Sequence, residues 1–178
     1  MRKFLFYLWI VLLGVFLVGC GSSVGSSGGD GDSKIDHDPP GMEGYVISVK
    51  GDRILVVEAK SQDFSSTGGE EEFYSAIWFS KAPDNMKVGQ KVQVWFDIVA
   101  ESYPGQSEAK KVVVLPSERP EGADLNEAEA IRKAFEAHAS DFMGVTVIKK
   151  VTYQADTDIW EVVLKQEAEE FKFDVKDE

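Results

Sequence analysis

A period of two is clearest in Lys91-Val92-Gln93-Val94-Trp95-Phe96-Asp97-Ile98. Alternate side chains of an extended strand point to opposite faces. One face of this strand is therefore apolar along its whole length and consists of Val92, Val94, Phe96 and Ile98. We expect that face to lie against a hydrophobic core, and the segment indicates a β fold.

Four further runs of β-branched and aromatic residues predict strands around this one. They cover residues 45–49, 54–57, 73–80 and 109–115. The first two flank Gly51-Asp52, which is typical of a hairpin. The run 73–80 is apolar in both phases, so we expect both of its faces to be covered. Five short strands separated by turns predict a small, closed or half-closed OB-like β-barrel over residues 42–116.

The loop before the last predicted strand is a candidate binding loop. It consists of Glu101, Ser102, Tyr103, Pro104, Gly105 and Gln106. Pro104-Gly105 suits the centre of a type II turn, and tyrosine is enriched at binding hot spots. The alternative is a structural turn whose tyrosine packs on the barrel. Trp95, in the outward phase of its strand, is a candidate aromatic surface, with strand packing as its alternative.

The C-terminal part predicts a small α+β module over residues 124–178, joined to the barrel by a linker at 117–123. Asp124 and Glu127 have the spacing of a capping box, which predicts a helix from there to about Ser140. Its apolar face would contain Leu125, Ala128, Ile131, Phe135 and His138. A three-stranded antiparallel sheet follows, with strands at about 146–153, 159–165 and 170–175.

The N-terminus has the layout of a secretory signal peptide over residues 1–19. Met1-Arg2-Lys3 is basic, residues 4–18 are mostly apolar, and Leu17-Val18-Gly19-Cys20 follows. This last stretch resembles the bacterial lipobox, which implies that Cys20 becomes the mature N-terminus, with a diacylglycerol on its sulfur and a fatty acid such as palmitate on its amine. A membrane-spanning anchor and an ordinary cleaved signal are the alternatives. Residues 20–41, rich in Gly, Ser and Asp, predict a flexible acidic tether.

The charge balance restricts the class of partner. Acidic residues outnumber basic ones by 31 to 19, and the formal net charge is −12. A strongly acidic surface repels polyanions, so we do not expect nucleic acid as a partner. Cationic peptides, basic proteins and divalent cations match this charge better.

The sequence predicts no enzyme. Its two histidines are His37, in the tether, and His138, beside the apolar helix face. Motifs for a serine nucleophile or a phosphate-binding loop are lacking. Cys20 is the only cysteine and the histidines lie about a hundred residues apart, so we expect no zinc site, and we predict no cofactor. Glu70-Glu71-Glu72 is either a hard-cation site or a solvated acidic loop, and both interpretations stay open.

Two resemblances add to this interpretation. Residues 44–115 resemble the YobA-like lipoproteins of Gram-positive bacteria, a family defined by a domain of unknown function. The matching pieces are Gly44-Tyr45-Val46, Ala76-Ile77-Trp78-Phe79, Val88-Gly89-Gln90-Lys91-Val92 and Glu101-Ser102-Tyr103-Pro104-Gly105-Gln106. The C-terminal part is similar to PepSY-like modules of secreted bacterial proteins in Glu127-Ala128-Glu129-Ala130-Ile131, Val151-Thr152-Tyr153 and Ile159-Trp160-Glu161-Val162.

The expected function follows from location more than from chemistry. We predict a lipoprotein on the extracytoplasmic face of the cell membrane, acting as a non-catalytic binding module for an envelope protein or polymer. The alternative, implied by the PepSY resemblance, is an envelope hydrolase or a peptidase-inhibiting factor.

Overall fold

The computed structural model describes residues 39–138 and 144–178, which lie in one compact unit. The predicted signal peptide, the predicted lipidation site Cys20, His37 and nearly all of the predicted tether lie outside the described residues. Within the described ranges, no helix has both the length and the apolar composition needed to cross a membrane.

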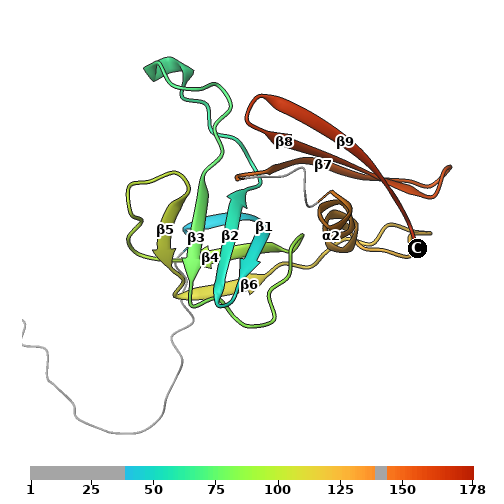
Figure 1. Cartoon of the computed structure of the whole chain (residues 1–178), viewed down its shortest axis with the longest axis horizontal. Coiled ribbons are helices and arrows are strands. Elements are labelled where there is room, and N and C mark those ends of the chain that lie inside the picture. Colours follow the sequence, from blue (N-terminus) through green and yellow to red (C-terminus); the bar gives the residue numbers. More distant parts are fainter. Residues whose placement is uncertain (1–38, 139–143) are drawn as a thin grey trace, which may run out of the picture. The chain divides into compact units, whose positions relative to one another are not determined.

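The first sheet contains six strands. They are β1 (Met42–Lys50), β2 (Arg53–Glu58), β3 (Ala76–Ser80), β4 (Lys91–Trp95), β5 (Gly105–Glu108) and β6 (Lys111–Val114). Their order is β5-β3-β2-β1-β4-β6, with β3 and β5 parallel and all other neighbours antiparallel (Figure 1). A mainly β fold is confirmed, but the sheet is open, so the expected closed barrel is not.

The strand expected over 109–115 is present as the shorter β6, and it is preceded by β5, which was not expected and which includes Gly105 and Gln106 of the predicted loop. β5 pairs with β3, whereas β6 pairs with β4 on the other side of the sheet. Between them the N–H of Ala109 donates to the Ser80 carbonyl at 3.0 Å and that of Lys110 to the Trp95 carbonyl at 2.8 Å. The chain changes its partner strand here, and residue composition carries no signal for such a change.

The apolar face predicted for the strand that begins at Lys91 is confirmed except at its C-terminal end. Val92 and Val94 are fully buried, and the Phe96 ring lies 5.0 Å from that of Phe79 in the same core. Ile98, expected to face inward, is 81% exposed. Pairing of β4 with β6 ends at Trp95, so the alternation of a paired strand no longer applies beyond it.

The second part of the chain forms a helix and a three-stranded antiparallel sheet, as expected. The helix α2 (Glu127–Ala137) is followed by β7 (Val147–Gln154), β8 (Ile159–Gln166) and β9 (Glu169–Lys176). The capping box lies at Asn126 and Glu129, two residues later than expected. Asn126 accepts from the Glu129 N–H at 3.0 Å, and Glu129 accepts from the Asn126 N–H at 2.9 Å. The predicted cap, Asp124, instead donates its N–H to the Asp177 carboxylate.

The strand β2 is buried on both faces, which divides the interior into two cores. Ile54 and Val56 lie in the first core, together with Phe79 and residues of β4. Leu55 and Val57 lie in the second, together with α2, β7 and β8, represented by Ile131, Val147 and Leu164. The C-terminal module therefore packs on the outer face of the first sheet, and the linker 117–123 does not separate two independent cores.

Two contacts show how closely α2 approaches the first sheet. The Tyr45 hydroxyl on β1 donates to the Glu127 carboxylate at 2.6 Å. Gly89 has a φ of +90°, and a Cβ there would lie 2.3 Å from the Ala128 carbonyl oxygen. Only glycine fits this position without displacing the helix backbone.

Candidate functional site

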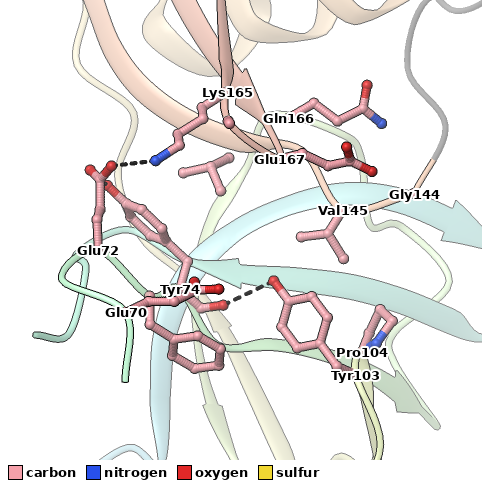
Figure 2. A pocket seen from close by; sticks show the side chains of 13 residues that line it. Glu70, Glu72, Tyr74, Tyr103, Pro104, Gly144, Val145, Lys165, Gln166 and Glu167 are labelled. Carbon is pink, nitrogen blue, oxygen red and sulfur yellow. Dashed lines mark hydrogen bonds and ion pairs between the residues drawn. The ribbon is translucent and has the colours of Figure 1, made fainter. Parts of the chain in front are cut away.

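A cleft of about 940 Å³ lies where the first sheet meets the C-terminal module. One wall consists of Glu70–Tyr74, which precede β3, and of the loop that carries Tyr103 (Figure 2). The other wall consists of the segment leading into β7 and the β8–β9 turn. Neither part of the chain forms the cleft alone.

Tyr103 belongs to both the fold and the cleft. Its hydroxyl donates to the Tyr74 carbonyl at 3.2 Å, yet its side chain is 58% exposed (Figure 2). Burial of the hydroxyl, and secondarily the charge of Glu70, raises the pKa of Tyr103 above its ordinary value. The tyrosine is therefore held in place while it lines the cleft and much of its side chain stays exposed.

The turn around Tyr103 differs from the expected type II turn. The Tyr103–Pro104 peptide is cis, and Gly105 lacks the positive φ that a type II turn requires at this position. Gly105 instead begins β5, where a Cβ would lie 2.7 Å from Val99. The Ser102 hydroxyl donates to the Pro104 carbonyl at 2.8 Å, so it serves the turn.

Three aromatic rings from two loops form a row, of which Phe73 and Tyr103 line the cleft and Phe64 lies beside it. The Phe64 ring is 5.6 Å from that of Phe73, which is 5.8 Å from that of Tyr103. Phe64 follows Asp63 and caps the short 3-10 helix η1 (Ser65–Thr67). Phe64 and Tyr103 are both exposed large apolar residues, so the row presents ring surface to solvent.

Glu72 closes one end of the cleft by joining the two parts of the chain. Its carboxylate binds Lys165 of β8 (Figure 2). It also binds Lys149 of β7 and accepts from the Tyr74 hydroxyl at 2.8 Å. These partners lower the pKa of Glu72 to about 2, against its ordinary 4.5. Lys149 also lies 5.6 Å from the Tyr74 ring centroid, which is a cation–π contact.

Two other carboxylates line the cleft without such partners. Within the described residues, no ion pair joins Glu70 or Glu167 to a basic side chain. Glu167 lies in the β8–β9 turn with a φ of +54°. Since Lys149 and Lys165 are already matched by Glu72 and Glu170, the cleft has surplus negative charge.

The titratable side chains that line the cleft are glutamate, tyrosine and lysine. Among the described residues, the lining contains no His, Cys, Ser, Thr or Asp. His138 follows α2, with its ring 4.0 Å from that of Phe173. Among the described residues no cluster of His, Cys, Asp and Glu is suited to hold a metal ion, and Glu72 of the acidic run binds lysines instead.

The structure brings together only part of the predicted binding surface. Tyr103 and Pro104 line the cleft, whereas Glu101 is exposed outside it and Gln106 accepts from Arg53 at 3.4 Å on β5. Trp95 lies on β4, and its ring centroid is 4.6 Å from the Lys111 ammonium nitrogen. It is not part of the cleft lining. It therefore belongs to a different surface from Tyr103.

Sequence reasoning missed the partners that complete the cleft. Tyr74 was assigned to a strand, although β3 begins only at Ala76. Lys165 lies 93 residues after Glu72 in the sequence, and Glu167 lies two residues further on. No local pattern relates them to Glu72. Only the packing of the two parts places these side chains around one space.

Comparison with known proteins identifies one domain. Residues 43–116 match a family model described as "Protein of unknown function (DUF3221)". Neither a curated protein nor a solved structure matches the chain.

Proposed function

We propose that this chain is a non-catalytic binding protein that takes up an envelope protein or polymer in the cleft between the DUF3221 segment and the C-terminal module. The observation that carries the proposal is the composition of that cleft. It combines aromatic rings, Phe73 and Tyr103, with walls tied together by the Glu72–Lys149 and Glu72–Lys165 ion pairs. A preformed concave site with aromatic lining and a few charged groups is typical of ligand-binding sites.

The covered outer face of the first sheet supports this location. OB-type domains bind oligonucleotides and oligosaccharides on the strand face around their second and third strands and on adjacent loops. Here Leu55, Val57 and Ala76 of that face lie in the core shared with the C-terminal module. The loops around the cleft are the ligand-accessible part that remains.

The electrostatics support binding over catalysis. A general acid requires a carboxyl whose pKa is raised toward the working pH. The Glu72 pKa is shifted in the opposite direction, to about 2, so its carboxylate stays ionised and paired. A carboxylate that stays ionised and paired joins the two parts of the chain and has a structural role.

The proposal includes a finer description of the fold, in which the first sheet is a half-closed OB-type barrel. Its support is the strand connectivity: β1 pairs with β2 and β4, and β3 pairs with β2 and, in parallel, with β5. The two edge strands, β5 and β6, are separated by only Ala109 and Lys110. A single bent strand that reaches both edges would bring the ends of the sheet together.

The family relationships and the location are part of the same proposal. We take the 44–115 segment as related to the YobA-like lipoproteins, and the helix with its three-stranded sheet as a PepSY-like module. The lipobox-like stretch ending at Cys20 supports a lipid anchor on the outer face of the cytoplasmic membrane. Globomycin, which blocks lipoprotein signal peptidase, should leave an unprocessed precursor; normal maturation in its presence would disprove the anchor.

The cleft is tested by crosslinking in intact cells followed by pull-down of the chain. Tyr103→Ala should lose the crosslinked partner while its melting temperature stays close to that of the parent. Trp95→Ala is the matched control, since it removes an aromatic side chain outside the cleft and should retain the partner. Retention of the partner by Tyr103→Ala, or equal loss in both variants, would contradict the cleft as the binding site.

A further inference from the structure

We infer that the occupant of the cleft is a basic peptide segment, which places a Lys or Arg side chain against the Tyr103 ring and between the carboxylates of Glu70 and Glu167. This inference rests on the proposed function and names its ligand class. It follows from three properties of the cleft: charge, ring surface and size.

Charge is the first property. The lysines at the cleft, Lys149 and Lys165, are engaged by Glu72, and Lys149 lies 3.8 Å from Glu170 as well. Glu70 and Glu167 are left with no basic partner within the described residues. The whole chain adds to this field, with 31 acidic and 19 basic residues. Such a field attracts a cation and raises its local concentration in the cleft.

The aromatic wall is the second property. A cation over the face of an aromatic ring is attracted by the ring quadrupole. One such pair already involves lining residues, since the ammonium of Lys149, beside the cleft, lies 5.6 Å from the Tyr74 centroid and binds Glu72. Tyr103, with Glu70 close enough to influence its hydroxyl, repeats the combination of ring and carboxylate. This second combination holds no lysine of the described chain.

Size is the third property. A space of about 940 Å³ is at the upper end of the range for sites that enclose a whole organic ligand. A lone metal ion or ammonium group would leave most of it empty. A peptide segment fills it, with a basic side chain at the carboxylates and apolar side chains along the rings of Phe73 and Tyr103.

The test uses the full chain in detergent and a short fluorescein-labelled peptide of alternating lysine and alanine. Fluorescence anisotropy should show binding that is lost at about 1 M salt, where the Debye length is about 3 Å. The same peptide with glutamate in place of lysine should not bind. An unlabelled chito-oligosaccharide serves as a probe for the glycan alternative and should not displace the lysine peptide.

Two sets of variants assign the binding to the cleft. Glu70→Gln combined with Glu167→Gln should weaken binding by about fivefold, and Tyr103→Leu, which keeps apolar bulk, by about threefold. The control combines Glu121→Gln with Asp156→Asn, which are exposed and outside the cleft lining. It removes the same charge and should leave the affinity unchanged, and all variants should retain the parent's melting temperature.

The outcomes separate this inference from the proposed function. Equal weakening in the control would show that the peptide responds to net charge alone and would overturn the inference. Binding of the oligosaccharide, or no binding of the lysine peptide, would overturn it as well. In either case, loss of the crosslinked partner in Tyr103→Ala would still support the cleft as the binding site, with a ligand of another class.

Discussion

The Tyr45 hydroxyl on β1 and the Glu127 carboxylate in the first turn of α2 are joined by a hydrogen bond of 2.6 Å across 82 residues of sequence. This bond ties the matched DUF3221 segment to the C-terminal module beside the core that both share. Cooperative unfolding of the two parts should therefore depend on it.

Tyr45→Phe should lower the free energy of unfolding by about 1–2 kcal/mol, since it removes a half-buried hydrogen bond to a charged acceptor. Chemical denaturation followed by tryptophan fluorescence measures this. Tyr153→Phe is the matched control: it removes a hydroxyl that lies 2.7 Å from Asp158 and 3.2 Å from the Gly122 carbonyl, both at exposed positions where water replaces the bond. An equal loss in both variants would contradict a special role for Tyr45.

Tyr45 should also make the stability of the fold depend on pH in the alkaline range. Burial, followed by the hydrogen bond to Glu127, raises the pKa of Tyr45 above its ordinary value of 10.0. The neutral tyrosine is thus favoured in the folded state, and its contribution is fully present below pH 10 and is lost as the pH rises above it. Thermal melts across this range should show a smaller alkaline loss in Tyr45→Phe than in the parent.

Phe96→Asp should destabilise the first sheet by about 3 kcal/mol or more, because it replaces a ring packed on Phe79 by a charge without a partner. Ile98→Asp makes the same chemical change two residues later and should leave the melting temperature nearly unchanged, as Ile98 is 81% exposed. If Ile98→Asp is as damaging as Phe96→Asp, then the alternation continues beyond β4 and the exposure of Ile98 is wrong.

Asp177→Ala should lower the melting temperature by several degrees. Its buried carboxylate accepts from the N–H groups of Asp124 and Leu125 and from the Trp160 indole at 2.9 Å, and all three donors would lose their acceptor. Asp174→Ala, on an exposed position of the same strand, is the control and should melt like the parent. Near-UV circular dichroism should also report the altered environment of Trp160 in the first variant only.

Asp177 should also make the stability of the fold depend on pH in the acidic range. Burial would raise the Asp177 pKa, but the hydrogen bonds from Asp124, Leu125 and Trp160 outweigh it, and the net pKa is lower than the ordinary 3.8. A lowered pKa stabilises the fold above pH 3.8, and this contribution is lost as the pH falls through the folded-state value. The difference in melting temperature between the parent and Asp177→Ala should therefore shrink below that pH.

Glu72 should titrate at about pH 2 in the folded protein, because its hydrogen bonds from Lys149, Lys165 and Tyr74 favour the ionised form. The stability that it contributes is present above about pH 4.5 and is lost as the pH falls toward 2. Carbon-detected NMR of the carboxyl groups measures the midpoint. Lys149→Met combined with Lys165→Met should move it upward, and an unchanged midpoint would show that these lysines do not set it.

Local patterns in the chain predicted the secondary structure well where a strand keeps one partner. The alternation through Val92 and Val94, and the run Trp160, Val162 and Leu164 on β8, match buried faces in the structure. The two-sided apolar character of 73–80 correctly indicated that both faces of β3 are covered. Each of these signals comes from burial, because a buried position is occupied by an apolar residue and can be recognised from the residue type.

Local sequence patterns did not indicate which strands and polar groups contact one another. The unexpected strand β5, the exposure of Ile98 and the capping box at Asn126 depend on which groups meet in space. Asn126 and Asp124 are both good caps by type, and the choice between them follows from Asp177, which engages Asp124 from 53 residues away.

The residues thus establish the β-rich fold, the helix followed by three strands, and the acidic character of the surface, because hydrophobic period and charge are properties of short segments. Tyr103 and Glu72 were visible as candidates for the same reason. Their meeting with Lys165 and Glu167 at one cleft arises only when the C-terminal module covers the outer face of the first sheet, because a site between two packed surfaces depends on long-range contacts.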